Sequence, residues 1–136
     1  MLKNLDKIDL SSNKITKIPY PELLNHTQTL IHLCLDSNKI SEIAEETLRQ
    51  VPLLSTLKLK SNHLNRLPDS LFSLAQLKVL DVSSNRLTAM SAKVSLLRQL
   101  RQLNIAENKL EGLPNSIGYL DLIESVTSEY FVYLND

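Results

Sequence analysis

The sequence contains few of the residue types on which several common protein classes depend. Its 136 residues include one cysteine, two glycines and no tryptophan. One cysteine excludes an intramolecular disulfide framework, and the two glycines, Gly112 and Gly118, do not form a phosphate-binding glycine-rich loop. The formal net charge is zero, which excludes an overall attraction to nucleic acid or to acidic lipid.

Long apolar runs are also missing. The first residues contain no such run, and we therefore expect neither a signal peptide nor insertion into a membrane. Apolar residues make up 43% of the chain and charged residues 22%, which is ordinary for a folded domain. The length suits a single domain.

A pattern of apolar residues and asparagine recurs along the chain. In residues 77–87, apolar side chains occupy places 1, 4, 6 and 11, and an asparagine occupies place 9. The pattern begins five times, at Leu5, Leu30, Leu54, Leu77 and Leu100. The intervals are 25, 24, 23 and 23 residues, and five matches in phase indicate a tandem repeat, not a chance motif.

The residues within one repeat indicate its local structure. Leu80 and Val82 alternate with the polar Asp81, which predicts a short strand with one buried face. Val94 and Leu97 continue the apolar row after the strand at a helix-like spacing. Each repeat is therefore predicted to form one strand, one turn and one short helical or extended return. A single repeat does not bury its apolar side, so stability requires stacking on the next repeat.

Place 9 of the pattern is an asparagine in all five repeats. An asparagine carries an acceptor and two donors on a short side chain. We interpret the column as structural, because each amide can satisfy backbone groups of its own and the neighbouring repeat where the chain leaves the strand. The column consists of Asn13, Asn38, Asn62, Asn85 and Asn108.

This pattern resembles the leucine-rich repeat, L-x-x-L-x-L-x-x-N-x-L. The returns that begin at Leu64 and Leu110 read L-x-x-L-P-x-x-[L/I]-x-x-L, similar to the intracellular 23-residue class of Ras-pathway scaffolds and Scribble/Erbin polarity proteins. The resemblance covers roughly residues 2–123. It implies an α/β fold, a right-handed horseshoe-shaped solenoid with a parallel sheet on its concave side. Residues 1–136 are then expected to form one domain of five full repeats, with a degenerate repeat or cap at 123–136.

Residues 123–136 follow the pattern only in part. Ile123 and Val126 keep the phase, but Phe131 stands in the asparagine place and Tyr133 in the last leucine place. We interpret this segment as a degenerate terminal repeat. The alternatives are the start of a fragment from a longer array and residues foreign to the protein. Four residues before the first repeat and an aromatic segment at the other end suggest two open apolar ends, from which we expect end-to-end self-association.

The single cysteine also bears on where the protein works. Secreted leucine-rich repeat domains commonly carry disulfide-bonded caps, which Cys34 alone does not provide. A reducing, cytoplasmic setting is therefore favoured. The one glycosylation triplet, at residues 25–27, is expected to be unused.

The outward-facing residues of the predicted strands are the candidate binding surface. They are polar and mixed in sign, and they lack the aromatic anchors that dominate tight interfaces. We predict that this concave face binds a protein or peptide, as in an intracellular adaptor or regulatory scaffold. The competing interpretation is a solvated face whose charges pair across the strands. The candidate residues are Lys7, Asp9, His32, Cys34, Asp36, Thr56, Lys58, Lys60, Val79, Asp81, Gln102 and Asn104.

The same surface leaves the wider function open. The alternative to an adaptor is the recognition domain of a larger protein, such as a ubiquitin-ligase substrate receptor, a phosphatase regulator or a pathogen effector. A nucleic-acid partner is not expected, because the face lacks a basic stripe with stacking aromatics.

One constellation suggests chemistry: His32, Cys34 and Asp36 share one face of a predicted strand. A metal or redox site at Cys34 is therefore a remote alternative. The surface is open, however, and Lys58 and Lys60 would repel a cation. No cleft is expected to enclose a serine-histidine-acid or paired-carboxylate arrangement. We predict no catalytic residue, no metal, no cofactor and no enzyme activity.

The residue after each asparagine is basic or a histidine. Such a row can steer an acidic partner toward the rim of the sheet. The favoured interpretation is that these long side chains cover the apolar edge beneath them. The row consists of Lys14, Lys39, His63, Arg86 and Lys109.

Overall fold

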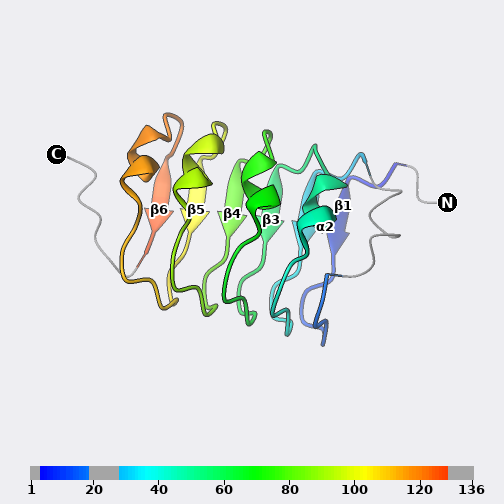
Figure 1. Cartoon of the computed structure of the whole chain (residues 1–136). Coiled ribbons are helices and arrows are strands. Elements are labelled where there is room, and N and C mark those ends of the chain that lie inside the picture. Colours follow the sequence, from blue (N-terminus) through cyan, green and yellow to red (C-terminus); the bar gives the residue numbers. More distant parts are fainter. Residues whose placement is uncertain (1–3, 19–27, 129–136) are drawn as a thin grey trace.

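A computed structural model of the chain describes residues 4–18 and 28–128. Each repeat contributes one short strand to a six-stranded parallel sheet in which the strands follow one another in chain order (Figure 1). The strands are β1 (Lys7–Asp9), β2 (His32–Cys34), β3 (Thr56–Lys58), β4 (Val79–Asp81), β5 (Gln102–Asn104) and β6 (Ser125–Thr127). The expected leucine-rich repeat solenoid with a parallel sheet is therefore confirmed.

The returns between strands contain short helices that stack in a second row beside the sheet (Figure 1). They are α2 (Glu45–Arg49) and three 3-10 helices, η1 (Asp69–Ser73), η2 (Ala92–Leu96) and η3 (Asn115–Tyr119). The sequence predicted helical or extended returns, and the 3-10 form follows from a spacing of three between apolar residues. In the third repeat the N–H of Leu74 donates to the Leu71 carbonyl at 3.2 Å, and that of Leu77 to the Leu74 carbonyl at 3.1 Å. A 3-10 turn has three residues, so all three side chains face the core. Within the described residues, no helix has the length and apolar character needed to cross a bilayer.

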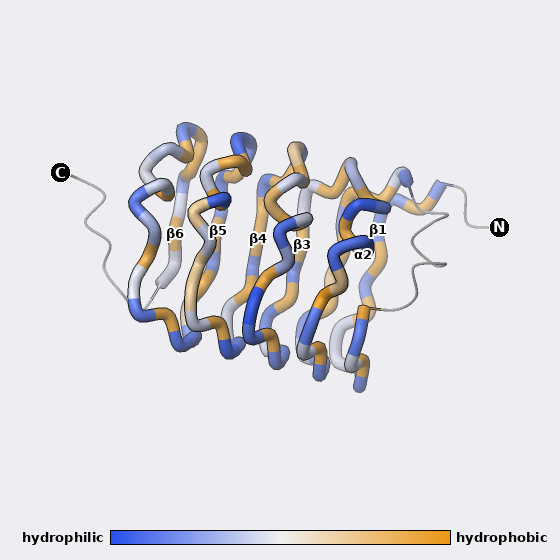
Figure 2. The backbone as a smooth tube through the Cα atoms, in the orientation of Figure 1, coloured by the Kyte–Doolittle hydropathy of each residue, from blue (hydrophilic) through white to orange (hydrophobic). Residues whose placement is uncertain are grey.

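The apolar core is one continuous cluster of residues from the strands and the returns. Figure 2 shows hydrophobic positions recurring along the backbone from repeat to repeat. The central residue of each strand points into the core, because alternate residues of a strand face opposite sides. Leu57 and Leu80, in the middle strands, are fully buried, and Ile8, in β1, is 8% exposed. The predicted burial of place 4 is confirmed at Ile8, Leu33, Leu57, Leu80 and Leu103.

The asparagine column forms a hydrogen-bond ladder between repeats. The Asn62 amide nitrogen donates to the carbonyls of Leu59 at 3.1 Å and Leu35 at 3.0 Å, and its oxygen accepts from the Ile40 N–H at 3.0 Å. Asn38, Asn85 and Asn108 make the same set of bonds to their own and the preceding repeat. These hydrogen bonds support the structural interpretation of the asparagine column.

Asn13 departs from the other members of the column. It is exposed, and among the described residues its amide nitrogen donates only to the carbonyls of Leu10 at 2.9 Å and Ser11 at 3.0 Å, within its own repeat. Its stabilising contribution is therefore expected to be smaller, because solvent competes for exposed hydrogen-bonding groups.

The residue before each asparagine adopts a left-handed conformation that the sequence did not indicate. Ser61 has a φ of 55° and Glu107 a φ of 53°, and Ser12, Ser37 and Ser84 occupy the same region. Residues with a Cβ rarely adopt this region, so each position carries a conformational cost. The asparagine that follows offsets this cost, because its amide bonds hold the turn closed.

The start of the sixth repeat is confirmed as a strand. β6 pairs with β5 in parallel register, with Val126 opposite Leu103, and Ile123 and Val126 pack partly buried against the core. Residues 129–136, which include Phe131 and Tyr133, lie outside the described residues. The choice between a degenerate repeat and a fragment of a longer array therefore stays a prediction.

Glu45 links the second and third repeats on the helical side. Its two carboxylate oxygens accept hydrogen bonds from the backbone N–H groups of Ser70, at 2.9 Å, and Asp69, at 3.0 Å. These bonds, that of Ser70 first, lower the pKa of Glu45 below its ordinary value near 4.5. A lowered pKa in the folded state means that the ionised form stabilises the fold above the ordinary value. This contribution is lost as the pH falls through the folded-state pKa.

We therefore expect Glu45→Gln to destabilise the protein in a pH-dependent way. At neutral pH its free energy of unfolding should lie below that of the wild type, and the gap should shrink as the pH is lowered below about 4.5. Urea unfolding followed by circular dichroism at several pH values measures the gap. The exposed neighbour Glu46 provides the control: Glu46→Gln should change the neutral-pH stability less. A gap that stays constant with pH would contradict the role of the ionised carboxylate.

Candidate functional site

The outward-facing residues of the strands form two rows that run across the sheet. Parallel pairing in register places equivalent residues of successive repeats side by side. The first row is Lys7, His32, Thr56, Val79, Gln102 and Ser125. The second row is Asp9, Cys34, Lys58, Asp81, Asn104 and Thr127. The structure thus brings ten of the twelve predicted surface residues into one two-row array. Asp36 and Lys60 follow just beyond the ends of their strands.

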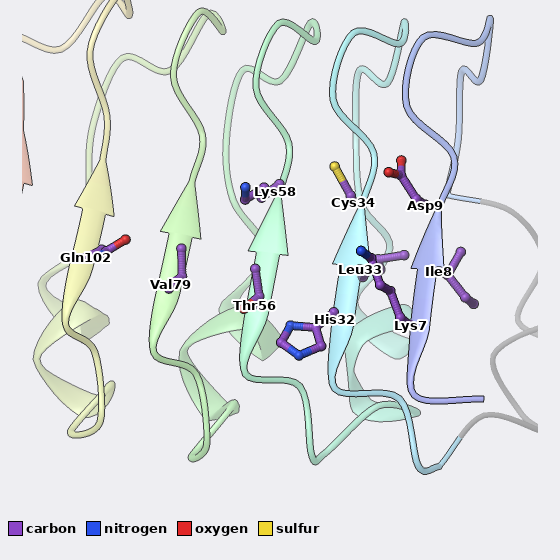
Figure 3. Close-up of a pocket in the computed structure, with 10 residues that line it drawn as sticks. All are labelled: Lys7, Ile8, Asp9, His32, Leu33, Cys34, Thr56, Lys58, Val79 and Gln102. Atoms are coloured by element: carbon purple, nitrogen blue, oxygen red, sulfur yellow. The ribbon is translucent and has the colours of Figure 1, made fainter. Parts of the chain in front are cut away.

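A hollow of about 500 Å³ lies on this face over β1 to β5, and we call it the concave hollow (Figure 3). Ile8 and Leu33, the central residues of β1 and β2, also border the hollow, although they belong to the core cluster. The lining residues are Lys7, Ile8, Asp9, His32, Leu33, Cys34, Thr56, Lys58, Val79 and Gln102. A smaller hollow of about 210 Å³ continues the surface over β3 to β6.

Two residues of the smaller hollow, Ser125 and Thr127, were not among the predicted surface residues. They come from β6, the strand of the sixth repeat. The repeat pattern could have identified them as outward-facing strand residues, because they occupy places 3 and 5 counted from Ile123.

The aspartates of the concave face are engaged by their own backbone and hydroxyl neighbours. One Asp81 oxygen accepts from the N–H of Ser83 at 3.0 Å and from its hydroxyl at 2.6 Å, and Asp9 makes the same two bonds with Ser11. The hydrogen bond from the Ser11 hydroxyl is the main cause that lowers the pKa of Asp9. These hydrogen bonds fix the orientation of both carboxylates at the ends of their strands. The carboxylates are therefore less free to pair with lysines.

The lysines of the same face lack such partners in the part of the chain that the structure describes. Lys7, Lys58 and Lys60 are exposed, and none forms an ion pair within residues 4–18 and 28–128. Ion pairs in that part of the chain lie elsewhere: Lys17 with Glu42, Lys93 with Asp69, and Arg101 with Glu124. The interpretation of a face neutralised by cross-strand pairs is therefore not supported. The lysine charges remain available to a partner.

His32, Cys34 and Asp36 are not brought to one point. His32 and Cys34 line the concave hollow, whereas Asp36 does not, and its carboxylate accepts from the Lys60 N–H at 2.8 Å. The Cys34 sulfur lies 3.0 Å from the Ser11 hydroxyl oxygen. Among the described residues, no group of three or more histidine, cysteine and acidic side chains is arranged to hold a metal. The metal or redox alternative gains no support.

The basic row after the asparagines runs along one rim of the sheet. A second backbone ladder fixes it: the N–H of Arg86 donates to the Leu64 carbonyl at 2.9 Å, and that of Lys109 to the Leu87 carbonyl at 2.9 Å. Lys14, Lys39, Arg86 and Lys109 are exposed, and His63 is partly buried. Binding by this row is untested and stays a secondary interpretation.

Comparison with known sequences identifies the repeat. The sequence profile described as leucine rich repeat matches residues 3–64 and 52–110. Human Toll-like receptor 8 is 39% identical over 70 residues, which are 52% of this chain and 7% of the receptor. The chain therefore spans a small part of such a relative, and the activity of the whole receptor does not transfer to it.

Solved structures contain the same architecture. A leucine-rich repeat protein of Leptospira interrogans aligns with a TM-score of 0.81 at 29% identity, over 93% of this chain and 33% of that chain. The ectodomain of the membrane receptor kinase GASSHO1/SCHENGEN3 of Arabidopsis thaliana, in complex with CASPARIAN STRIP INTEGRITY FACTOR 2, aligns with a TM-score of 0.78 at 27% identity. That match covers 93% of this chain and 16% of the ectodomain.

Proposed function

The chain belongs to the leucine-rich repeat family, and from this premise we propose that it binds a protein or peptide partner on its concave face. Solenoids of this kind present extended concave surfaces that are commonly used for protein binding. The observation that carries the proposal is the concave hollow, which is open to solvent and bordered by lysines without ion-pair partners among the described residues. We assign the contacts to the two rows of outward-facing strand residues.

Similar structures include complexes, which supports a binding role for this chain. The GASSHO1/SCHENGEN3 ectodomain was solved with a bound factor, and another similar chain, from the BIR3–SERK2 complex of Arabidopsis thaliana, aligns with a TM-score of 0.72 at 28% identity. We infer that the present chain serves as a recognition surface, without enzyme activity of its own. Whether it is an adaptor or the recognition part of a larger protein depends on sequence beyond these repeats.

The proposal includes one domain over residues 1–136 and a cytoplasmic adaptor role. The continuous sheet from β1 to β6 supports a single domain. The cytoplasmic setting rests on the single cysteine, and the similar structures do not favour it, because they include the ectodomain of a membrane receptor. Self-association through the ends also remains a prediction, which light scattering over a wide concentration range tests.

Charge reversal tests the binding face. We expect the double substitution Lys58→Glu/Lys60→Glu to slow association with a captured partner and to change its salt dependence, because both ammonium groups lie on the proposed surface. Affinity capture from lysate identifies partners, and surface plasmon resonance at two salt concentrations measures the association rate of a purified one.

The matched control reverses two exposed arginines on the helical side, Arg49→Glu/Arg66→Glu. This variant carries the same change in net charge, so it separates a local contact from a general charge effect. It should bind nearly as the wild type does. Unchanged binding by the concave variant, with loss in the helical-side variant, would overturn the proposal.

A further inference from the structure

The concave hollow changes in chemical character along its length, and this gradient indicates what it binds. The first row begins with the cationic Lys7 on β1 and His32 on β2, continues with the Thr56 hydroxyl on β3, and reaches the aliphatic Val79 on β4. An occupant that runs across the strands therefore meets polar, cationic groups at one end and an apolar surface further along. This argument deepens the proposed concave binding and rests on it.

Two lysines and a histidine surround one part of the hollow. Figure 3 shows the Lys7 side chain leaning from β1 toward β2, the His32 ring between β2 and β3, and the Lys58 ammonium on the β4 side of β3. Two ammonium groups and one carboxylate, that of Asp9, line the hollow. These two lysines and the aspartate give the lining a net charge of one positive unit, which one carboxylate on a partner would balance.

The carboxylate of Asp9 sets a limit on the charge of that partner group. Asp9 is held by the N–H and the hydroxyl of Ser11, at 3.0 and 2.5 Å, and these hydrogen bonds lower its pKa, so it remains ionised at neutral pH. A phosphate with nearly two negative charges would exceed the one positive charge that the lining offers and would leave negative charge unbalanced beside Asp9. A carboxylate, whose single charge is balanced, therefore fits the charge of the lining better.

The apolar part of the hollow fixes a spacing. Val79 is half-buried on β4, two strands beyond β2, where the Lys7 and His32 side chains lie. At about 4.8 Å per strand this separation is about 10 Å. A peptide in the polyproline II conformation advances about 3.1 Å per residue and has three residues per turn, so side chains three residues apart lie on the same face about 9 Å apart. About three residues of such a peptide therefore join the two places.

We infer that the concave hollow binds a peptide segment in the polyproline II conformation that carries one aspartate or glutamate and, about three residues away, one aliphatic side chain. The acidic side chain lies over β2, between Lys7 and Lys58, and the aliphatic side chain packs on Val79. The peptide crosses the strands of the sheet.

Peptide titration of the isotope-labelled full chain tests this directly. The probe is an acetylated octapeptide of serine and glycine with one glutamate and, three positions later, one leucine. Two-dimensional nuclear magnetic resonance reports binding even at millimolar affinity and shows which backbone N–H groups respond. We expect shifts at β2, β3 and β4, and weaker binding when glutamate is replaced by glutamine or leucine by serine. A phosphoserine version should bind no better than the glutamate version.

Variants of the protein locate the charge recognition. Lys7→Gln and Lys58→Gln should each weaken binding of the glutamate peptide by about two- to fivefold, the range of an exposed ion pair, and should leave the glutamine peptide unaffected. The matched control is Lys78→Gln, because Lys78 is also an exposed lysine but does not line the hollow. It should bind both peptides as the wild type does.

The outcomes separate this inference from the proposed function. Concave shifts that are equal for the glutamate and glutamine peptides, or a phosphoserine peptide that binds better, would overturn the acidic motif while leaving concave binding intact. Loss of a captured protein partner only after changes on the helical side would overturn the proposed function itself. No shift with any peptide at millimolar concentration would also overturn the inference.

Discussion

Replacing Leu57 with alanine is expected to lower the free energy of unfolding by about 2–5 kcal/mol, the range for a large-to-small change in a packed core. Leu57 is fully buried at the centre of β3, which pairs with β2 on one side and β4 on the other. A cavity there removes contacts with the neighbouring repeats on both sides. Because each repeat depends on its neighbours for burial, the loss should affect the whole array.

Urea unfolding followed by far-ultraviolet circular dichroism measures this loss. Leu96→Ala is the matched control, because Leu96 is 55% exposed at the end of η2 and should lose little when truncated. Equal destabilisation by the two substitutions would show that burial in the central strands does not determine stability.

Asn62→Ala is expected to cost about 1–3 kcal/mol, mainly through one backbone group. The Ile40 N–H donates to the Asn62 side-chain oxygen at 3.0 Å, and alanine offers it no acceptor. The Leu35 and Leu59 carbonyls are less affected, since each also accepts from a second asparagine, Asn38 or Asn85. In the asparagine ladder, two neighbouring asparagines therefore donate to each of these carbonyls, but only one asparagine accepts from the N–H group.

Asn13→Ala provides the comparison within the same column. Asn13 is exposed, and the Leu10 carbonyl that it contacts also accepts from the Asn38 amide at 3.0 Å. Thermal and urea unfolding of the two variants should place Asn62→Ala well below Asn13→Ala in stability. If Asn62→Ala melts as the wild type does, the asparagine ladder does not stabilise the stack in the way described.

Some local features could not be predicted because they depend on contacts between repeats. Nothing in the sequence around Ser61 or Glu107 predicts a left-handed backbone, since glycine is the residue that favours it. The conformation follows from closing the turn so that the next asparagine reaches carbonyls of two repeats. Likewise, the sequence predicted both Asp36 and Lys60 as binding-surface residues. In the structure the Asp36 carboxylate accepts a hydrogen bond from the backbone N–H of Lys60 in the next repeat.

The sequence by itself determined the fold, the positions of the strands, the buried leucines and the role of the asparagine column, because a local pattern repeated in phase specifies the same unit each time. Only the tertiary structure decided which outward-facing charges remain available. The carboxylates of Asp9 and Asp81 accept hydrogen bonds from Ser11 and Ser83, whereas Lys7 and Lys58 line the concave hollow. The physical reason is that a hollow and its charge balance arise from side chains of several repeats, whose distances are set only when the repeats stack.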